Sequence, residues 1–167
     1  MNQHTDIFLI GFMGAGKSTV ARALQSQYGM ALVEMDEQIE AEQGMKISEI
    51  FAQKGEAYFR ALETQLLESL QQREHTVVSC GGGVPMRACN VDAMRKSGTI
   101  VYLSAEPETI YERVRHFHTR PLLEGNMNVE YIAQLLDQRL PKYLAAADKT
   151  VRTDRRTTEE ICKEILV

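Results

Sequence analysis

The sequence predicts an α/β fold in which helices cover both faces of a five-stranded parallel sheet. Short apolar runs alternate with segments of helical periodicity along the chain, and a glycine-rich turn joins the first run to the first helical segment. This alternation is typical of parallel sheets with crossover helices, whose ligands bind beyond the carboxyl ends of the strands. We therefore expect one three-layer α/β/α domain over residues 1–167, a length that supports a substantial core without disulfides.

Each expected element follows from its periodicity or its flanking residues. The strands are expected at 6–10, 31–35, 75–80, 99–103 and 148–152. Helical periodicity occupies the intervals near 18–28, 36–43, 47–72, 88–96, 107–115 and 128–145. A last helix near 157–166 begins behind Thr157, Thr158, Glu159 and Glu160, residue types that cap helix starts. The segment 113–127, rich in Arg, His, Gly and Asn, has weak periodicity and is expected to be mobile.

The turn after the first expected strand has the pattern GxxxxGK[ST]. Gly11, Gly14 and Gly16 allow positive φ angles, so that backbone N–H groups can converge on one polyphosphate. The helix that starts there favours an anion at its N-terminus. Lys17 is expected to reach the β- and γ-phosphates, and Ser18 to ligate the Mg²⁺ that bridges them. The strand–loop–helix setting argues against a chance glycine-rich turn.

Composition excludes several classes of function. A net charge of −4 and a pI near 5.6 argue against a nucleic-acid-binding surface. The cysteines Cys80, Cys89 and Cys162 lack CxxC spacing, which favours free thiols in a reducing compartment. The N-terminus does not resemble a signal peptide, and no apolar run approaches the length of a membrane span. We expect a cytoplasmic protein that is not bound to membranes.

Polar residues follow the next strands at the same edge of the sheet. Glu34 and Asp36 end the second strand, with both side chains expected on one side by the two-residue period. The triplet 81–83 ends the third strand and allows a ligand to approach backbone N–H groups closely. Between them, Arg60 lies one helical step from Glu63, which can orient it.

These motifs, taken in order, resemble the shikimate kinase family of P-loop kinases, which has the nucleoside-monophosphate-kinase fold. The resemblance extends from Ile7 to about Arg156 and rests on GFMGAGKST at 11–19, the acidic pair at 34–36, FRALE at 59–63, GGG at 81–83, RPLL at 120–123 and RLPKY at 139–143. Singly, the triplet and the pentads are weak signals. Their order and spacing make the resemblance specific.

The resemblance implies an acceptor site for shikimate, a carboxylated cyclohexene triol, with substrate-binding helices at about 36–63. Arg60 and Arg139 resemble the arginines that bind the carboxylate, for which guanidinium forks are well suited. Asp36 resembles the aspartate that holds the hydroxyls and orients or deprotonates the attacking one, and Gly82 would donate from its backbone. Taken alone, the arginines read as surface charges, Asp36 as a helix N-cap and the glycines as a plain turn.

The segment 113–127 resembles the family's lid over the nucleotide. The resemblance places Arg120 at the transferring phosphoryl group, as an arginine finger within the same chain, and Arg113 against the adenine. A solvated basic loop is the alternative for both. His116 and His118 have no counterpart in the family pattern and are expected to be exposed without binding metal.

The nucleotide side is expected to use Gly14, Ala15, Gly16, Lys17, Ser18 and Thr19 together with the two lid arginines. One departure from the family concerns the metal. The family commonly has Asp-x-Asp after the second strand, and its first aspartate positions Mg²⁺ through water. Here Glu34 holds that position with one more methylene, which leaves its role towards the metal open. Ser18 is the expected metal ligand.

The resemblance implies that the chain transfers the γ-phosphoryl group of ATP to the 3-hydroxyl of shikimate, with Lys17, Asp36 and Arg120 as the catalytic residues. This is a step of the shikimate pathway to chorismate and the aromatic amino acids. Two alternatives stay open, a kinase of the same architecture acting on gluconate or a nucleoside monophosphate, and a nucleotide-binding module without catalysis. No exposed heptad seam is visible, so a monomer is expected.

Overall fold

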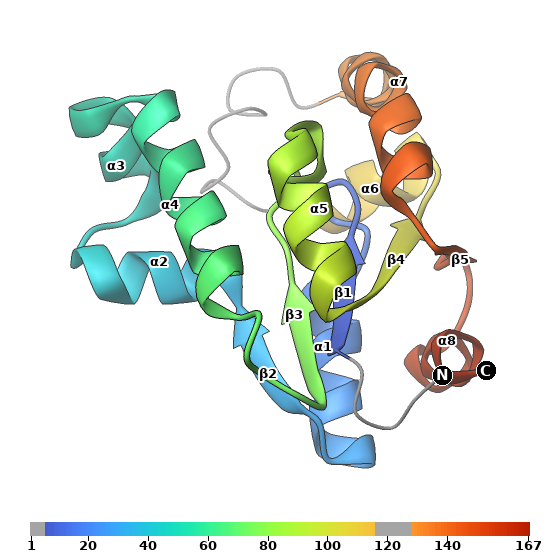
Figure 1. The fold of residues 1–167 in the computed structure, drawn as a ribbon. Helices are drawn as coiled ribbons and strands as arrows, with labels where there is room; N and C mark the ends of the chain where they lie inside the picture. The colour runs from blue at the N-terminus through green and yellow to red at the C-terminus, as the bar shows by residue number, and fades with distance from the viewer. Residues whose placement is uncertain (1–5, 116–127) are drawn as a thin grey trace.

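In the computed structural model, which describes residues 6–115 and 128–167, five parallel strands form one sheet in the order β2-β3-β1-β4-β5 (Figure 1). The elements are β1 Asp6–Ile10, α1 Lys17–Tyr28, β2 Ala31–Glu34, α2 Met35–Gln43, α3 Ile47–Lys54, α4 Glu56–Ser69, β3 Thr76–Ser79, the 3₁₀ helix η1 Val84–Met86, α5 Ala88–Ser97, β4 Gly98–Ser104, α6 Pro107–Val114, α7 Val129–Ala146, β5 Lys149–Arg152 and α8 Thr158–Leu166. The predicted fold class and all five strands are confirmed.

The central strand β1 explains why the apolar runs are continuous. It pairs with β3 and β4 and is buried throughout, with Phe8 opposite both Val78 and Ile100. Successive side chains point to opposite faces, so Phe8 and Ile10 join one core and Ile7 and Leu9 join the other. Strands buried on both faces are therefore nearly continuous apolar runs, and the buried Asp6 is the polar exception in β1.

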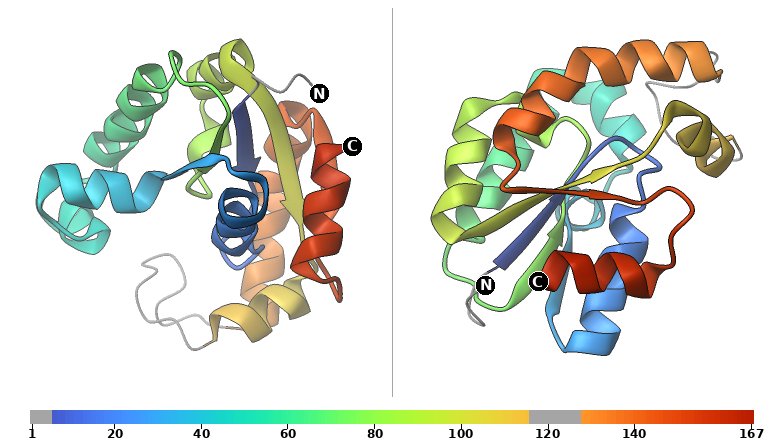
Figure 2. Two further views of the ribbon diagram at one scale, coloured as in Figure 1. Left: turned by 90° about the horizontal axis from the view of Figure 1, so that it is seen from below. Right: turned by 90° about the vertical axis from the view of Figure 1, so that its right-hand side faces the viewer.

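Two groups of helices complete the three layers (Figure 2). On one face α1 and α8 pack over Leu9, Val77 and Val101. On the other face α4, α5 and α7 cover Phe8 and Ile10. The helices α2 and α3 extend beyond the carboxyl end of β2 (Figure 1). This arrangement leaves the carboxyl edge of β1, β2 and β3 open to a cavity.

The structure corrects one predicted helix. The expected helix over 47–72 is two helices, α3 and α4, which meet at Gly55. Gly55 has φ 89° and ψ 166°, a conformation that ends one helix and turns the chain into the next. The residues around this glycine favour helix on both sides, and the apolar periodicity alone did not reveal the break.

A second correction concerns the end of β2. The strand stops at Glu34, and Met35 and Asp36 already belong to α2. The two-residue strand period therefore does not relate Glu34 to Asp36, and the N-cap of α2 is Glu34 rather than Asp36. The expected cap of the last helix is confirmed, because the Thr157 side chain accepts a hydrogen bond from the Glu160 N–H at 3.1 Å.

None of the helices over 6–115 and 128–167 is both long enough and apolar enough to cross a membrane. The cysteines Cys80, Cys89 and Cys162 are free thiols. Burial raises the pKa of the Cys80 and Cys162 thiols, so both remain protonated within the core.

Candidate active site

A cavity of about 490 Å³ opens at the carboxyl edge of β1, β2 and β3. Its wall combines the glycine-rich loop before α1, the start of α2, one face of α4 and the triplet after β3. The predicted site residues that line it are Gly14, Gly16, Lys17, Ser18, Thr19, Asp36, Arg60, Gly82, Arg113 and Arg139. The topology thus brings together residues that are far apart in the sequence.

The loop between β1 and α1 has the backbone that its glycines predict. Gly11, Gly14 and Gly16 have φ angles of 152°, 81° and 100°. At Gly14 a side chain is excluded as well, because a Cβ would lie 2.5 Å from Val114 Cγ1. The Lys17 ammonium donates to the carbonyl oxygens of Gly11 and Phe12, which keeps it folded over the loop. The loop therefore has a backbone that can bind an anion, and the Lys17 ammonium already lies beside it.

Ser18 is held by the acidic residue that departs from the family pattern. Its hydroxyl donates to Glu34 Oε2 at 3.0 Å, while Glu34 Oε1 is buried without a hydrogen-bond partner. A hydroxyl oxygen beside an unsatisfied carboxylate oxygen is a donor set that suits Mg²⁺, which takes few protein ligands and completes its shell with phosphates and water. Within the ranges that the structure describes, no three His, Cys, Asp or Glu side chains form a metal-binding group.

Two guanidinium groups lie over the glycine triplet at the other end of the cavity. A Cβ at Gly83 would come within 2.5 Å of Arg60 Nη1, and one at Gly82 within 3.0 Å of Arg139 Nη1. The absence of side chains at these glycines therefore allows both guanidinium groups to approach the backbone. The result is a positively charged end of the cavity with backbone groups beside it.

Arg60 is fixed by carboxylates on its own helix. Its Nη1 donates to Glu63 Oε1 at 2.8 Å, and Glu56 lies 3.4 Å away on the preceding turn. Burial alone would lower the pKa of Arg60, but Glu63 and Glu56 raise it, so the group is a permanent cation. The orienting role predicted for Glu63 agrees with this contact.

Glu63 also approaches Asp36. Its side chain is fully buried, and Oε2 has no hydrogen-bond partner. A Cβ at Gly81 would lie 2.9 Å from this oxygen and 3.2 Å from Asp36 Oδ1, so both carboxylates face the same glycine. Burial raises the pKa of Glu63, Arg60 lowers it, and Asp36 raises it further, with a net increase. A pair of carboxylates therefore lies beside the two cations.

Arg139 is held differently, by aromatic side chains. Its guanidinium lies 5.6 Å from the ring centroid of Phe12 and donates to the Tyr143 hydroxyl. That hydroxyl in turn donates to the Gly82 carbonyl at 2.7 Å, and the Tyr143 ring stacks on Tyr102 at 5.1 Å. Burial raises the pKa of Tyr143, so the phenol stays protonated and able to donate.

Tyr143 is a site residue that the sequence analysis missed. It belongs to the pentad RLPKY, from which only Arg139 received a role, and the spacing of four residues on one helix was the available signal. Apolar residues Met13, Ile47, Phe51 and Phe59 were also missed, although they line the cavity. Met13 lies at a variable position of the glycine-rich motif, and the periodicity that places the other three on helices does not show which of their faces meet the cavity.

Arg113 lies in α6 rather than in an irregular lid segment. Its Nη1 donates to Gly14 O at 3.0 Å and to Thr153 Oγ1 at 3.2 Å, and its Nη2 donates to Thr153 O at 3.2 Å. It thereby ties the glycine-rich loop to the segment after β5. Burial lowers the pKa of Arg113, partly offset by Asp154. The expected contact with adenine remains a prediction.

Ala15 and the residues of the expected lid beyond Arg115 remain to be placed. Ala15 is buried at 1% exposure and does not line the cavity, so only its backbone can face a ligand. Arg120 lies outside the described residues, as do His116 and His118 and the remainder of the expected lid from 116 onwards.

The chain is similar in sequence and in fold to proteins named shikimate kinase. The family model described as shikimate kinase matches residues 13–167. A shikimate kinase of Dehalococcoides mccartyi is 40% identical over 165 residues, which cover 99% of this chain and 93% of that protein. The solved structure of the Acinetobacter baumannii shikimate kinase in complex with shikimate has a TM-score of 0.92 at 34% identity and covers 98% of this chain and 91% of that one. The Aquifex aeolicus shikimate kinase has a TM-score of 0.82 at 36% identity, with 96% and 94% covered.

A gluconokinase from Sinorhizobium meliloti has a TM-score of 0.58 at 19% identity, which shows a shared fold alone.

Proposed function

The chain belongs to the shikimate kinase family, and we propose that it transfers the γ-phosphoryl group of ATP to the 3-hydroxyl of shikimate, giving shikimate 3-phosphate and ADP. The observation that carries this proposal is the layout of the cavity. A loop shaped for phosphates lies at one end, and two guanidinium groups with two carboxylates lie at the other. An acceptor with one carboxylate and several hydroxyls matches that second end.

The nucleotide occupies the loop end. Backbone N–H groups of Gly14, Ala15 and Gly16 surround the phosphates, and Lys17 leaves its loop carbonyls to pair with the β- and γ-phosphates. Ser18 and Thr19 lie in the first turn of α1, whose N-terminus favours the same anion.

The metal expected to accompany ATP is Mg²⁺, and Ser18 and Glu34 would hold it. Bound there, it would supply positive charge to offset that of the β- and γ-phosphates. The Ser18 hydroxyl directs its proton to Glu34 and so presents a lone pair to the cation, while the second Glu34 oxygen is available to a ligand or a water.

The acceptor occupies the guanidinium end. Arg60 and Arg139 bind the carboxylate through paired N–H groups, and Gly82 donates from its backbone. Asp36 accepts from the ring hydroxyls and orients the attacking one. Because little covalent chemistry is required of the protein in phosphoryl transfer, positioning of this kind supplies most of the catalysis.

Two further arginines, Arg120 of the expected lid and Arg113 of α6, complete the proposal. Arg120 stabilises charge on the transferring group, in the manner of an arginine finger. Arg113 contacts the adenine with the face of a guanidinium that is already tied to Gly14 and Thr153. Closure over both substrates excludes water, which prevents loss of the γ-phosphoryl group by hydrolysis.

The test is ADP production from Mg-ATP with shikimate, run beside gluconate, AMP and no acceptor. We expect turnover with shikimate alone. Asp36→Asn keeps the size of the side chain but removes its charge, and it is expected to lower kcat by about 10²- to 10⁴-fold. Turnover with gluconate or AMP instead would contradict the acceptor assignment. Nucleotide binding without acceptor-dependent turnover would favour a non-catalytic module.

We also propose that the protein acts as a monomer in the cytoplasm. Its free cysteines support a reducing compartment. Among residues 6–115 and 128–167, the large hydrophobic residues with appreciable exposure are scattered rather than clustered on one element; they are Tyr28, Tyr58, Leu144 and Val167. Light scattering coupled to gel filtration tests the monomer, for which one species of 18.9 kDa is expected.

A further inference from the structure

A fully buried asparagine joins the helix that carries Arg60 to the turn that carries the glycine triplet. Asn90 in α5 has 0% exposure. Its Nδ2 donates to the Val84 carbonyl at 2.9 Å, and its Oδ1 accepts from the Thr64 hydroxyl at 2.7 Å. Because a carbonyl oxygen only accepts, the amide nitrogen must face Val84, and the Thr64 hydroxyl must then donate. The direction of both hydrogen bonds is therefore determined.

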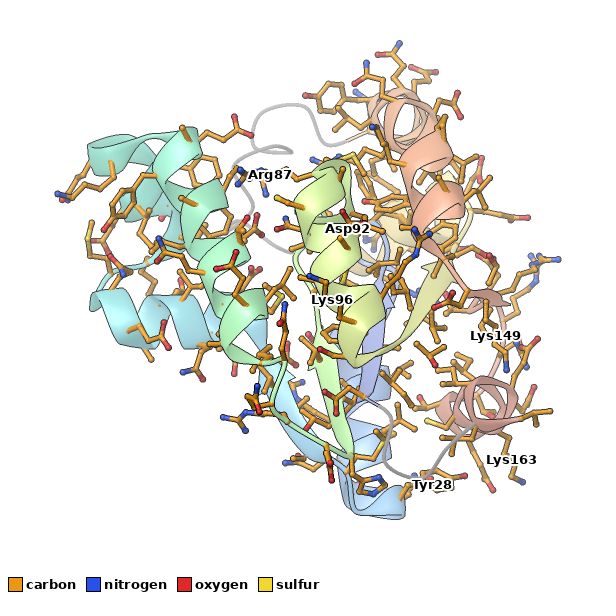
Figure 3. The ribbon with its side chains drawn as sticks, in the orientation of Figure 1. Tyr28, Arg87, Asp92, Lys96, Lys149 and Lys163 are labelled. Atoms are coloured by element: carbon orange, nitrogen blue, oxygen red, sulfur yellow. The ribbon has the colours of Figure 1, made fainter. Side chains whose placement is uncertain are left out.

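Arg87 extends this connection to the backbone of Arg60. Figure 3 shows Arg87 at the start of α5, where the chain approaches α4, whereas Asp92 and Lys96 lie further along the exposed side of the helix. Arg87 Nη1 donates to Thr64 Oγ1 at 3.0 Å and to the Arg60 carbonyl at 3.1 Å. The resulting set of hydrogen bonds, here termed the α4–turn link, consists of Arg87, Thr64, Asn90 and the Val84 carbonyl.

The α4–turn link connects α4, which carries Arg60, to the glycine-triplet turn, against which the Arg60 guanidinium lies. Val84 directly follows Gly83, and its N–H donates to the Gly81 carbonyl at 3.1 Å, closing the turn of the triplet. A Cβ at Gly83 would contact three atoms of the Arg60 guanidinium at 2.5–2.9 Å. A change in the spacing between α4 and η1 therefore moves Arg60 relative to the backbone groups that face the same ligand.

We propose that Asn90, through Thr64, is a positioning residue for the acceptor substrate: it sets the spacing between α4 and the glycine triplet and thereby the place of Arg60. The inference rests on the proposed function, since it assigns Arg60 to the substrate carboxylate. Asn90 does not line the cavity. It acts through the two elements that do.

Burial of the amide favours this role over simple filling of the core. A buried amide costs free energy unless its groups are paired, and an apolar residue would fill the same volume without that requirement. Here the Asn90 amide pairs with Val84 on one side and Thr64 on the other, one partner from each element of the acceptor site. Directed hydrogen bonds fix a geometry that apolar contacts leave adjustable.

The main test uses Thr64, because its hydroxyl can be removed without changing the volume. For Thr64→Val we expect the KM for shikimate to rise about tenfold, as loss of one hydrogen bond would produce. The KM for ATP and kcat should stay within about twofold. Calorimetric titration of shikimate without nucleotide should show the same loss of affinity. Thr64→Ser retains the donor and should restore values close to the wild type.

Two further variants separate positioning from general destabilisation. Ile165→Val removes a methyl group from the α8 side of the core, far from the cavity, and should lower stability without changing the KM for shikimate. Arg87→Gln alters the exposed end of the α4–turn link and gives a second test should Thr64→Val fail to fold. We expect about a threefold rise in the KM for shikimate from it.

An unchanged KM for shikimate in both Thr64→Val and Arg87→Gln would overturn the inference. So would an equal rise of the KM for shikimate and the KM for ATP, or a Thr64→Ser variant as impaired as Thr64→Val. If the wild type itself does not phosphorylate shikimate, the proposed function fails, and that outcome is visible before any variant is measured.

Discussion

At the scale of single residues, the two arginines of the acceptor end are held by different forces. Arg60 lies between two carboxylates on its own helix, so its orientation is set by electrostatics. Arg139 rests on the ring of Phe12 and the hydroxyl of Tyr143, so its orientation is set by the planar shape of its guanidinium. A lysine can replace the charge of either residue. It cannot replace the stacking or the forked hydrogen bonding of either arginine.

Arg139→Lys is therefore expected to raise the KM for shikimate by about 10- to 100-fold, the effect of losing one charge-assisted hydrogen bond. The KM for ATP should change little, because Arg139 lies at the acceptor end. Steady-state kinetics with each substrate varied in turn measures both values. Arg95→Lys is the matched control, since Arg95 is exposed on α5, bonds to the Ala145 carbonyl and does not line the cavity. A parallel rise in both KM values for Arg139→Lys would contradict the assignment.

A second prediction at the scale of single residues concerns the role of Glu34 at the metal site. Glu34→Gln keeps the size of the side chain but removes the charge beside Ser18. We expect the variant to bind ADP about tenfold more weakly than the wild type in the presence of Mg²⁺ and equally well in EDTA, because groups that orient metal ligands contribute on that scale. Calorimetric titration with ADP under both conditions measures this.

The control for Glu34 is Glu37→Gln. Glu37 also lines the cavity, but it is exposed and lies 3.8 Å from Arg22 rather than beside Ser18. An equal weakening of ADP binding in EDTA for Glu34→Gln would mean that this residue supports the loop rather than the metal.

At the scale of elements, Gly55 is the position where the sequence and the structure diverge most. The helical pattern of 47–72 continues through it, yet φ 89° and ψ 166° place it in a region that only glycine occupies readily. The break turns α4 so that Arg60 and Glu63 face the cavity. One backbone conformation thus determines how the acceptor site is presented.

Gly55→Ala is expected to lower the free energy of unfolding by about 1–3 kcal/mol, the cost of a strained backbone conformation. No atom lies within 4 Å of the added Cβ, so the effect isolates the backbone. Gly29→Ala is the matched control. Gly29 has φ 69° and ψ 19°, which other residues tolerate better, and it too has no neighbour within 4 Å. Urea unfolding measures both variants, and equal losses would argue against the special conformation of Gly55.

The features that depend only on neighbouring residues in the chain could be predicted from the sequence. The strands, the glycine-rich loop and the cap at Thr157 follow from residue order and were predicted within one or two residues. Tyr143 and Asn90 were not, because their roles depend on which elements lie against them. A polar residue on a helix face looks alike in sequence whether it meets solvent or, as Asn90 does, another helix.

At the scale of the whole molecule, the sheet separates two hydrophobic cores, and the candidate active site lies at the carboxyl edge of the sheet. The strands β1, β3 and β4 contribute apolar side chains to both cores, whereas the edge strand β5 contributes only Val151, to the core under α1 and α8. That division explains why the fold class was predictable from alternating runs, whereas the assembly of the cavity required the strand order β2-β3-β1-β4-β5. The order places β3 between β1 and β2, so the residues that follow these three strands meet at one edge of the sheet.

The stability of this assembly depends on pH through a buried carboxylate outside the cavity. Asp154, in the segment after β5, accepts from the Glu106 N–H at the start of α6 at 2.9 Å. Burial would raise the pKa of Asp154, but this hydrogen bond, one from Thr109 and the charges of Arg152 and Arg113 lower it below 3.8. Because the folded-state pKa lies below the unfolded-state value, Asp154 stabilises the fold above pH 3.8 and loses that contribution as the pH falls through its folded-state pKa.

We therefore expect the difference in unfolding free energy between the wild type and Asp154→Asn to be larger at pH 7 than at pH 3. Urea titrations at both pH values measure it, and other titrating groups cancel in the difference. Asp6→Asn should show the opposite trend. Burial in β1 raises the pKa of Asp6, so its contribution is present at low pH and is lost as the pH rises through that raised value. An Asp154→Asn difference that stays constant between pH 7 and pH 3 would mean that the anchoring of α6 to the segment after β5 does not depend on the charge of Asp154.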